Sequence, residues 1–151
     1  MNKTELTAYV RSLAPGCEVK EGKQFSEIDI PAELLHGVAL KLRQDEAASF
    51  DFLDCITGID YGQYLGAIYH LFSTRHGHTI VLRVRTGDRE NPHFDSITDI
   101  WKSADFLERE VFDLLGIKFT NHPDLRRLFL DKSWGFPLRK DYADDIKIVT
   151  K

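Results

Sequence analysis

The chain has 151 residues, 42% of them hydrophobic and 29% charged, with a formal net charge of −4. This length and composition predict one folded domain with a core of its own, and they exclude an intrinsically disordered chain. The small negative charge argues against nucleic acid as the main partner, because phosphate binding requires a basic face.

The first third of the chain predicts two helices separated by two strands. Apolar residues at helical spacing indicate a short amphipathic helix from Thr4 to Leu13, which ends before Pro15. Two short strands are predicted between Glu18 and Ile30. Pro31 suits the first turn of a second helix, whose apolar stripe continues to about Arg43.

The middle of the chain is rich in strand-forming residues. Strands are predicted from Phe50 to Ile59, Tyr64 to Ser73 and Thr79 to Arg85, in an antiparallel meander. Alternation along the third strand gives it one buried face and one wetter face. Residues 1–95 are therefore predicted to form an α+β two-layer domain, in the order helix-strand-strand-helix-three strands, with the helices on one face of the sheet.

A third helix, carrying an E-R-E motif, is predicted in residues 96–116, with a start at about Ser96 or Ala104. Apolar residues recur at helical spacing from Ile97 to Leu115, and Gly116 occupies a position that commonly ends a helix. Glu108 lies inside this stripe, where a carboxylate loses water and needs a cation and hydrogen bonds in compensation. The alternative is a tilted stripe that leaves Glu108 at the wet edge of the helix.

Residues 117–151 are predicted to form an extended, partner-docking arm. The segment has little periodicity, and between Asn121 and Tyr142 it carries two more basic than acidic residues, although the whole chain is acidic. It also carries aromatic and aliphatic groups, such as Phe129 and Trp134, that protein interfaces favour. The alternative is an arm that wraps back over its own sheet.

We expect Glu108 and Arg109 to be structural charges. Arginine pairs well with a buried carboxylate because its planar group donates two parallel hydrogen bonds and keeps its charge. The expected partners of Glu108 are one or more of the arm's arginines, Arg126, Arg127 and Arg139. Arg109 is expected to pair along the helix surface with carboxylates four residues to either side, Asp105 and Asp113.

Residues 104–142 resemble the signature of the 30 kDa (C) subunit family of respiratory complex I. Four elements occur in the family's order and spacing: E-R-E at residues 108–110, G-I at 116–117, H-P-D-L-R-R at 122–127 and G-F-P-L-R-K-D-Y at 135–142. The predicted domain before them is also similar to the family's domain. Chance similarity over four linked elements is a poor explanation.

The resemblance implies a non-catalytic structural and assembly subunit in the peripheral arm of proton-translocating NADH:quinone oxidoreductase. The implied partners are the D (49 kDa) subunit, on which the C-terminal arm would dock, and the B and I subunits. NADH, FMN, the iron–sulfur clusters and quinone would be bound in the complex but not by this chain, which lacks cluster-type cysteine sets and a G-x-G-x-x-G motif. The implied location is the cytoplasmic side of the bacterial inner membrane, reached only through the complex.

The resemblance assigns no catalytic, cofactor-binding or metal-binding residue to this chain. It implies instead a set of interface and structural residues in the third helix and the arm. They are Glu108, Arg109, Glu110, Asp113, Gly116, His122, Pro123, Asp124, Arg126, Arg127, Pro137, Leu138, Arg139, Lys140, Asp141 and Tyr142.

The expected compartment follows from the cysteines and the N-terminus. Cys17 and Cys55 lie far apart and form no C-x-x-C motif, so we expect two reduced thiols in a reducing compartment. The first residues lack the apolar stretch of an export signal. The longest apolar stretches, such as Gly66 to Phe72, are far shorter than the roughly 20 residues that a transmembrane helix needs.

Three other functions remain open from the sequence. A metal hydrolase would use the histidine cluster of His70, His76, His78 and His93. Acid–base catalysis would use the helix carboxylates Glu108, Glu110 and Asp113, although Glu108 and Asp113 lie on different helix faces. The serious rival is the equivalent subunit of a complex I-related membrane-bound hydrogenase or ferredoxin-linked dehydrogenase, because the electron donor binds elsewhere.

Overall fold

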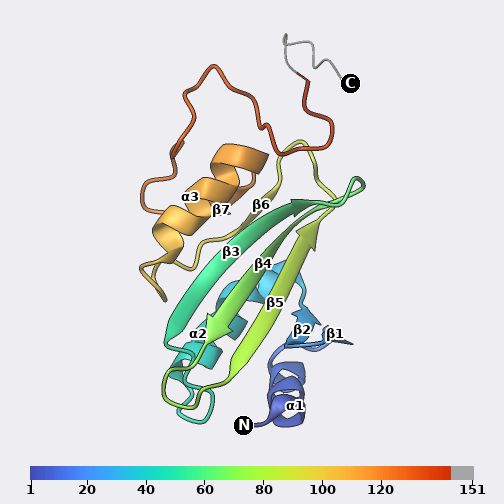
Figure 1. Cartoon of the computed structure of the whole chain (residues 1–151), viewed down its shortest axis with the longest axis vertical. Coiled ribbons are helices and arrows are strands. Elements are labelled where there is room, and N and C mark those ends of the chain that lie inside the picture. Colours follow the sequence, from blue (N-terminus) through green and yellow to red (C-terminus); the bar gives the residue numbers. More distant parts are fainter. Residues whose placement is uncertain (144–151) are drawn as a thin grey trace.

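Figure 1 shows the computed structural model of the chain, which describes residues 1–143. Two helices and five strands precede the third helix in the predicted order, and a short 3-10 turn and two very short strands are added to it. The elements are α1 (Lys3–Leu13), β1 (Glu18–Glu21), β2 (Ser26–Asp29), the 3-10 turn η1 (Ala32–Leu34), α2 (Leu35–Gln44), β3 (Phe52–Asp60), β4 (Leu65–Phe72), β5 (Thr79–Thr86), β6 (His93–Asp95), α3 (Ala104–Leu115) and β7 (Lys118–Thr120).

The main sheet has five strands in the order β1-β2-β5-β4-β3. Strands β3, β4 and β5 form the predicted antiparallel meander. The β1–β2 hairpin joins this meander because β2 pairs with β5 in parallel, an arrangement that the strand patterns did not predict. Strand β3 is therefore an edge strand, on the side of the sheet away from the hairpin (Figure 1).

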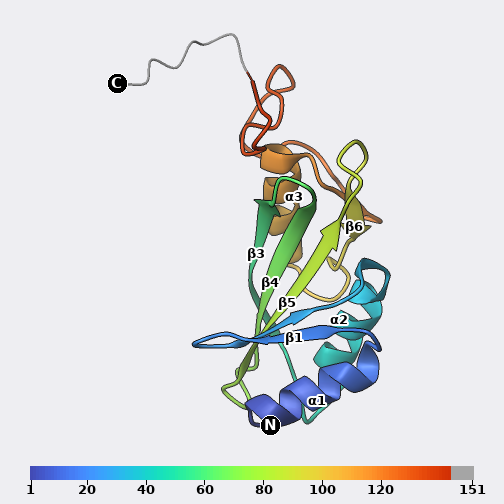
Figure 2. The ribbon, with the colours of Figure 1, turned by 90° about the vertical axis from the view of Figure 1, so that its right-hand side faces the viewer.

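The helices lie on one side of the meander, and none of the described residues 1–143 forms a helix on the other face (Figure 2). The alternation predicted for β5 is present, because Ile80 and Leu82 are fully buried while Arg83 and Arg85 lie on the more exposed face. The buried residues of the sheet and the helices form one hydrophobic core. The α+β two-layer architecture is thus confirmed.

The N-terminal helix begins where its sequence predicts. The Asn2 side chain accepts the Glu5 N–H at 2.8 Å, and the Glu5 carboxylate accepts the Asn2 N–H at 2.8 Å, which together form a capping box. Leu6 and Val10 are the buried residues of this helix. Burial of these two side chains attaches α1 to the rest of the core.

Helix α3 begins at Ala104, the later of the two predicted starts, and not at residue 96. The preceding residues form a turn, in which both Ile100 and Trp101 donate their N–H groups to the Ile97 carbonyl. The Trp101 indole N–H donates to the carbonyl oxygen of Phe50 at 3.0 Å, inside the core. This bond fixes the turn against the domain. The first part of the apolar stripe, from Ile97 to Trp101, is therefore an irregular buried segment, and only the later part is helical.

Strands β6 and β7 were not predicted, and they pair in parallel on either side of α3 in the chain. Each has three residues, too few for a recognisable alternation. Their central residues, Phe94 and Phe119, are buried with ring centroids 6.5 Å apart. The pair ties the entrance and the exit of α3 together, so the segment predicted as a featureless arm begins with a strand.

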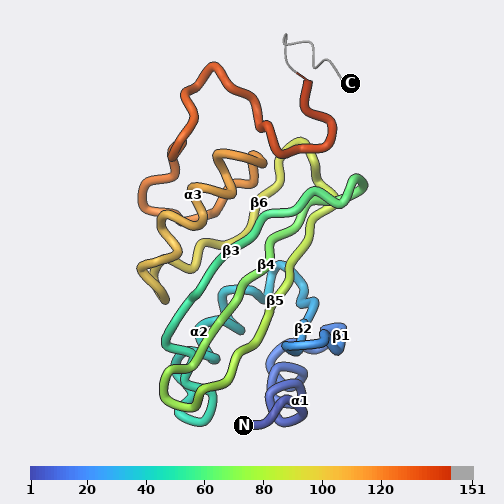
Figure 3. Tube along the Cα trace, viewed as in Figure 1, coloured from blue at the N-terminus to red at the C-terminus, as the bar shows by residue number. Residues whose placement is uncertain are grey.

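After β7 the chain continues past α3 and crosses the C-terminal end of that helix (Figure 3). The last part of the predicted arm, residues 144–151, lies outside the described residues. Within residues 1–143, no helix combines the length and the apolar character that crossing a bilayer would require.

Candidate functional site

The apolar stripe of α3 brings Glu108 into the core, where its exposed fraction is 0%. The Ser96 hydroxyl donates to Oε2 at 2.7 Å, and the Ile97 N–H donates to Oε1 at 2.8 Å. Burial raises the pKa of Glu108 to about 7, although both hydrogen bonds act in the opposite direction. The alternative of a carboxylate at the wet edge of the helix is thereby excluded.

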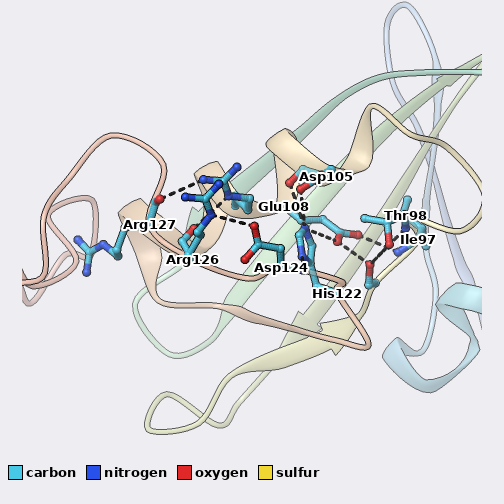
Figure 4. A network of polar contacts seen from close by, with 10 residues as sticks. Ile97, Thr98, Asp105, Glu108, His122, Asp124, Arg126 and Arg127 are labelled. Carbon is cyan, nitrogen blue, oxygen red and sulfur yellow. Dashed lines mark hydrogen bonds and ion pairs between the residues drawn. The ribbon is translucent and has the colours of Figure 1, made fainter.

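His122 is a second buried side chain near Glu108 and lies at the start of the arm (Figure 4). Its Nε2 is 3.9 Å from Oε2 of Glu108 and donates to the Asp105 carbonyl oxygen at 3.1 Å. The Asp124 N–H donates to Nδ1 at 3.0 Å, so Nδ1 is an acceptor and the ring proton lies on Nε2. His122 thus lies beside Glu108 without forming a close ion pair with it.

The hydrogen-bonding groups around Glu108 suit either protonation state of its carboxyl group. The Ser96 hydroxyl lies 2.7 Å from the carboxylate and 2.9 Å from the Thr98 hydroxyl. When Glu108 is ionised, Ser96 donates to it; when Glu108 is protonated, Ser96 accepts from it and donates to Thr98. Glu108 gains or loses a proton here without a change in which groups are partners.

The expected pairing of Glu108 with an arm arginine is wrong. Arg127 pairs with Asp113 at 2.5 Å, and Arg126 pairs with the exposed Asp124 at 2.9 Å. The Ser96 and Ile97 segment occupies the hydrogen-bonding positions around Glu108, so no arginine is needed there.

The expected partners of Arg109 are also wrong. Its guanidinium does not pair with Asp105 or Asp113, but donates from Nε to the Arg126 carbonyl and from one terminal nitrogen to the Arg127 carbonyl, each at 3.2 Å. Arg109 is 7% exposed, so these two bonds satisfy a nearly buried cation. The side chain therefore holds the backbone of the H-P-D-L-R-R motif against α3.

Asp113 is the second anchor of the arm. It is fully buried and accepts hydrogen bonds from Arg127 Nε at 2.5 Å, from the Phe129 N–H at 2.8 Å and from the Leu130 N–H at 3.1 Å. Burial acts to raise the pKa of Asp113, but these donors outweigh it and the pKa lies below its usual value. The ionised carboxylate thus fixes a turn of the arm on α3.

The C-terminal end of α3 is the third anchor. Gly116 ends the helix at φ +74°, a left-handed conformation that glycine adopts without strain, and the ring of Phe136 fills the space where a Cβ would lie. Arg139 Nε donates to the Leu115 carbonyl at 2.6 Å, and the Leu138 N–H donates to the Leu114 carbonyl at 3.0 Å. The G-F-P-L-R-K-D-Y motif therefore satisfies the free carbonyls of this helix end.

A fourth anchor was missed by sequence reasoning. Asp60, at the end of β3, accepts two hydrogen bonds from Arg89 at 2.7 and 2.8 Å and one from the Lys140 N–H at 2.8 Å. Hydrogen bonding from Arg89 holds the pKa of Asp60 well below its usual range. Arg89 also lies 3.5 Å from Asp141. The alternating strand and the polar loop gave no signal that these two residues meet.

The C-terminal segment thus does not leave the domain, because its polar side chains and backbone groups bond to α3 and to the end of β3. Three of its large apolar side chains nevertheless point outward: Phe129 is 71% exposed, Leu138 59% and Trp134 42%. Residues 121–142 therefore combine an inner polar attachment with an outer apolar surface, which we name the arm surface. Its members are Phe129, Trp134 and Leu138.

The remaining predicted interface residues lie around these anchors. Glu110 lies half-buried on the flank of α3 that faces β3, in a surface groove. Pro123 borders a shallow hollow with Phe106, and Pro137 follows the half-buried Phe136. The Tyr142 N–H donates to the Arg139 carbonyl at 3.1 Å.

The structure does not bring the candidate catalytic carboxylates together. Glu108 faces the segment before α3, Glu110 faces the edge of β3 and Asp113 faces the arm. Within residues 1–143 no three His, Cys, Asp or Glu side chains are grouped as metal ligands. Two of the candidate histidines, His76 and His78, instead bond the carbonyl oxygens of the loop that precedes β3, at 2.8 and 2.6 Å.

Relatives support the family that the motifs resemble. Residues 28–146 match the family described as "Respiratory-chain NADH dehydrogenase, 30 Kd subunit". The chain is 40% identical over 147 residues to the C subunit of NADH-quinone oxidoreductase of Sinorhizobium medicae, covering 91% of this chain and 71% of that protein. It is 38% identical over 136 residues to the corresponding C subunit of Moorella thermoacetica, covering 88% and 90% respectively.

The chain is also similar to part of a longer protein and to one chain of a solved membrane complex. The chain is 52% identical over 121 residues to the C/D subunit of NADH-quinone oxidoreductase of Phocaeicola vulgatus, which covers 79% of this chain but only 23% of that protein. A chain of the membrane-bound sulfane sulfur reductase, an archaeal respiratory membrane complex, superposes with a TM-score of 0.78 at 22% identity, covering 93% of this chain and 85% of that one. At that identity the likeness shows a shared fold. By its sequence matches, this chain belongs to the family of the 30 Kd subunit of respiratory-chain NADH dehydrogenase.

Proposed function

We propose that the chain is a structural and assembly subunit of the peripheral arm of an NADH:quinone oxidoreductase, docked on the D-type (49 kDa) subunit through its arm. The observation that carries this proposal is the two-sided arm. Its inner side is fixed by Arg109, Asp113 and Arg139, whereas the arm surface exposes three large apolar side chains. Apolar and aromatic groups held on a fixed backbone favour binding of another protein, because little further ordering is needed.

The name of the fused relatives supports a D-type neighbour. In Phocaeicola vulgatus one polypeptide carries the combined name C/D, and this chain matches only 23% of its length. Two subunits joined in one polypeptide lie close together in their assembly, because a linker restricts their separation. We infer that the D-type subunit lies against the part of this chain nearest the arm, and that B- and I-type subunits complete its surroundings.

The chain's contribution to catalysis is then geometric. NADH, FMN, the iron–sulfur clusters and quinone would be bound by other subunits, with this domain as a rigid adaptor between NADH and quinone. Arg109 and Asp113 would act as structural charges that fix the arm, and Glu108 as one that fixes the turn before α3, because each bonds groups of its own chain. The complex would lie on the cytoplasmic side of the inner membrane, and this chain would reach the membrane only through it.

A second candidate function is the equivalent subunit of a related membrane-bound hydrogenase or ferredoxin-linked dehydrogenase. The fold similarity to a chain of an archaeal membrane-bound sulfane sulfur reductase favours it, since that protein is a respiratory membrane complex with another substrate. Purification of the native complex through a tag on this chain decides between the two. Co-purification of a flavin-containing NADH-oxidising subunit supports the first, and its absence beside a hydrogenase-type or ferredoxin-linked module supports the second.

The docking proposal is tested by a double substitution on the arm surface. We expect Phe129→Ala with Trp134→Ala to reduce the amount of D-type subunit that co-purifies with the chain, without unfolding the domain. Phe106→Ala is the matched control, because Phe106 is an aromatic residue of α3 that is 61% exposed outside the arm surface. Equal recovery of the D-type subunit with both proteins would contradict docking through the arm.

The structural role of Glu108 is tested by two substitutions at that position. Glu108→Ala removes the acceptor for Ser96 and the Ile97 N–H, and we expect it to lower complex assembly and quinone-linked activity together. Glu108→Gln keeps a similar shape and an acceptor for Ile97, so assembly should be retained. Normal assembly of the alanine variant with a selective loss of turnover would instead indicate a chemical role.

A further inference from the structure

The edge of β3 offers unpaired backbone groups beside α3. β3 is the last strand of the sheet, and within residues 1–143 no other strand pairs with its outer edge. The Tyr61 N–H donates to the Tyr64 carbonyl across the turn to β4, so the backbone N–H and C=O groups of Tyr61 point toward β4. Because the direction alternates along a strand, the backbone groups of Ile56 and Gly58 face the free edge.

The two ends of this edge are occupied by the chain itself. At the start of β3, the Ser103 hydroxyl donates to the Leu53 carbonyl at 3.2 Å. At the other end, the arm crosses β3, where the Lys140 N–H bonds the Asp60 carboxylate. The unoccupied edge is therefore the short central section around Ile56 and Gly58.

A groove of about 250 Å³ lies between this section and the flank of α3. Its β3 wall is residues 55–58. Its α3 wall includes the half-buried side chains Leu107, Glu110 and Leu114, with the buried Val111 and Leu115 at its base. Leu138 of the arm surface also lines it. Glu110 is the single charged side chain of the lining, and within residues 1–143 it forms no ion pair.

We propose that an extended segment of the neighbouring subunit pairs with the central section of β3 as an added strand and carries a lysine or arginine that meets Glu110. Free backbone groups at a sheet edge select an extended chain, and the leucines of α3 select apolar side chains on the face beneath the helix. The isolated carboxylate in this apolar groove selects a cation. Leu138 makes the groove continuous with the arm surface, so one neighbour would cover both.

This inference rests on the proposed function, and backbone amide exchange tests it separately. In the isolated full-length chain, the Ile56 and Gly58 amides should exchange rapidly, whereas the Thr57 amide, which faces β4, should be protected. In the purified complex, exchange at Ile56 and Gly58 should slow by roughly 100-fold or more, as expected when new hydrogen bonds close these amides. The Thr57 amide is the internal control.

Charge reversal provides the second measurement. Glu110→Lys should reduce retention of the chain in the complex several-fold at low ionic strength, and Glu110→Gln should reduce it less. Glu46→Lys is the matched control, because Glu46 is exposed in the loop before β3 and does not line the groove. Protection of the Thr57 amide in the isolated Glu110→Lys chain confirms that the variant is folded.

The outcomes separate this inference from the proposed function. If the chain co-purifies with the complex but Ile56 and Gly58 exchange as rapidly as in the isolated chain, the strand addition is wrong and the family role stands. If the chain joins no complex at all, the proposed function itself fails. The Ile56 and Gly58 amides could instead be protected already in the isolated chain, and lose this protection when residues 144–151 are deleted. That result would overturn the inference, because the chain's own C-terminal residues would then occupy the groove.

Discussion

Replacing Glu108 by glutamine should remove a pH-dependent loss of stability from the isolated chain. The folded state raises the pKa of this carboxyl from 4.5 to about 7, because burial disfavours its charge. A folded-state pKa above the unfolded value stabilises the protein at low pH. That stability is fully present below about pH 4.5 and is lost as the pH rises through about 7.

The expected magnitude follows from the size of this rise. Each pH unit between the two pKa values corresponds to about 1.4 kcal/mol, so the wild-type chain should lose about 3 kcal/mol between pH 4.5 and pH 7 through this residue. Glutamine is neutral at every pH, and its carbonyl oxygen still accepts the Ile97 N–H while Ser96 accepts from its amide. The free energy of unfolding of the variant minus that of the wild type should therefore increase by about 3 kcal/mol over this range.

Urea denaturation at four pH values between 4.5 and 8 measures this difference. Subtraction of the two proteins cancels the titration of all other groups. Glu110→Gln is the matched control, because it removes a carboxylate from the same helix at a half-buried position. A difference between Glu108→Gln and wild type that stays constant across the range would refute the reasoning, and would mean that Glu108 is ionised at little cost in the folded chain.

Three further substitutions test the anchors and the packing of α3. Asp60→Ala should lower the free energy of unfolding by about 3 kcal/mol, because it removes the carboxylate that accepts both hydrogen bonds from Arg89. Since folding depresses the pKa of Asp60, the stability that this carboxylate contributes is present above about pH 4 and is lost as the pH falls below that value. Asp113→Asn should speed tryptic cleavage of the arm, because an amide has one acceptor oxygen, whereas the carboxylate accepts from three donors at its two oxygens. Gly58→Ala should cost about 2 kcal/mol, because a Cβ at this position collides with the Leu115 side chain.

The corresponding controls are exposed positions on the same elements. Asp54→Ala on β3 should leave the free energy of unfolding within about 0.5 kcal/mol of the wild-type value. Asp124→Asn, at the exposed start of the arm, should leave arm cleavage nearly unchanged if attachment depends on Asp113. If Asp54→Ala loses as much stability as Gly58→Ala, then β3 is sensitive to any substitution. The collision with α3 would then not be the cause of the loss in Gly58→Ala.

The features that sequence predicted well are those with a local cause. The burial of Glu108 follows from its place between apolar neighbours on one helix, and the end of α3 follows from Gly116. The meander follows from alternation along each strand. In each case the decisive residues lie within one or two turns or within one strand, so a periodic pattern contains the information.

The partners of the charges could not be predicted in the same way. Any of several arginines can satisfy Glu108 on the basis of charge alone, and the choice depends on where the turn before α3 and the arm lie in space. The turn presents Ser96 and the Ile97 N–H to Glu108, which leaves Arg127 to pair with Asp113. The Asp60–Arg89 pair joins a strand end to a distant loop, and neither residue carries a periodic signal.

The parallel pairing of β2 with β5 has a consequence for the order of folding. Residues 27–29 on β2 contact residues 81–83 on β5, and α2, β3 and β4 lie between them in the chain. Local hairpins close at a smaller entropic cost than such a distant pair, so we expect the meander to form first. The β1–β2 hairpin, although the ribosome makes it early, would then complete the sheet only after β5 has been synthesised and paired.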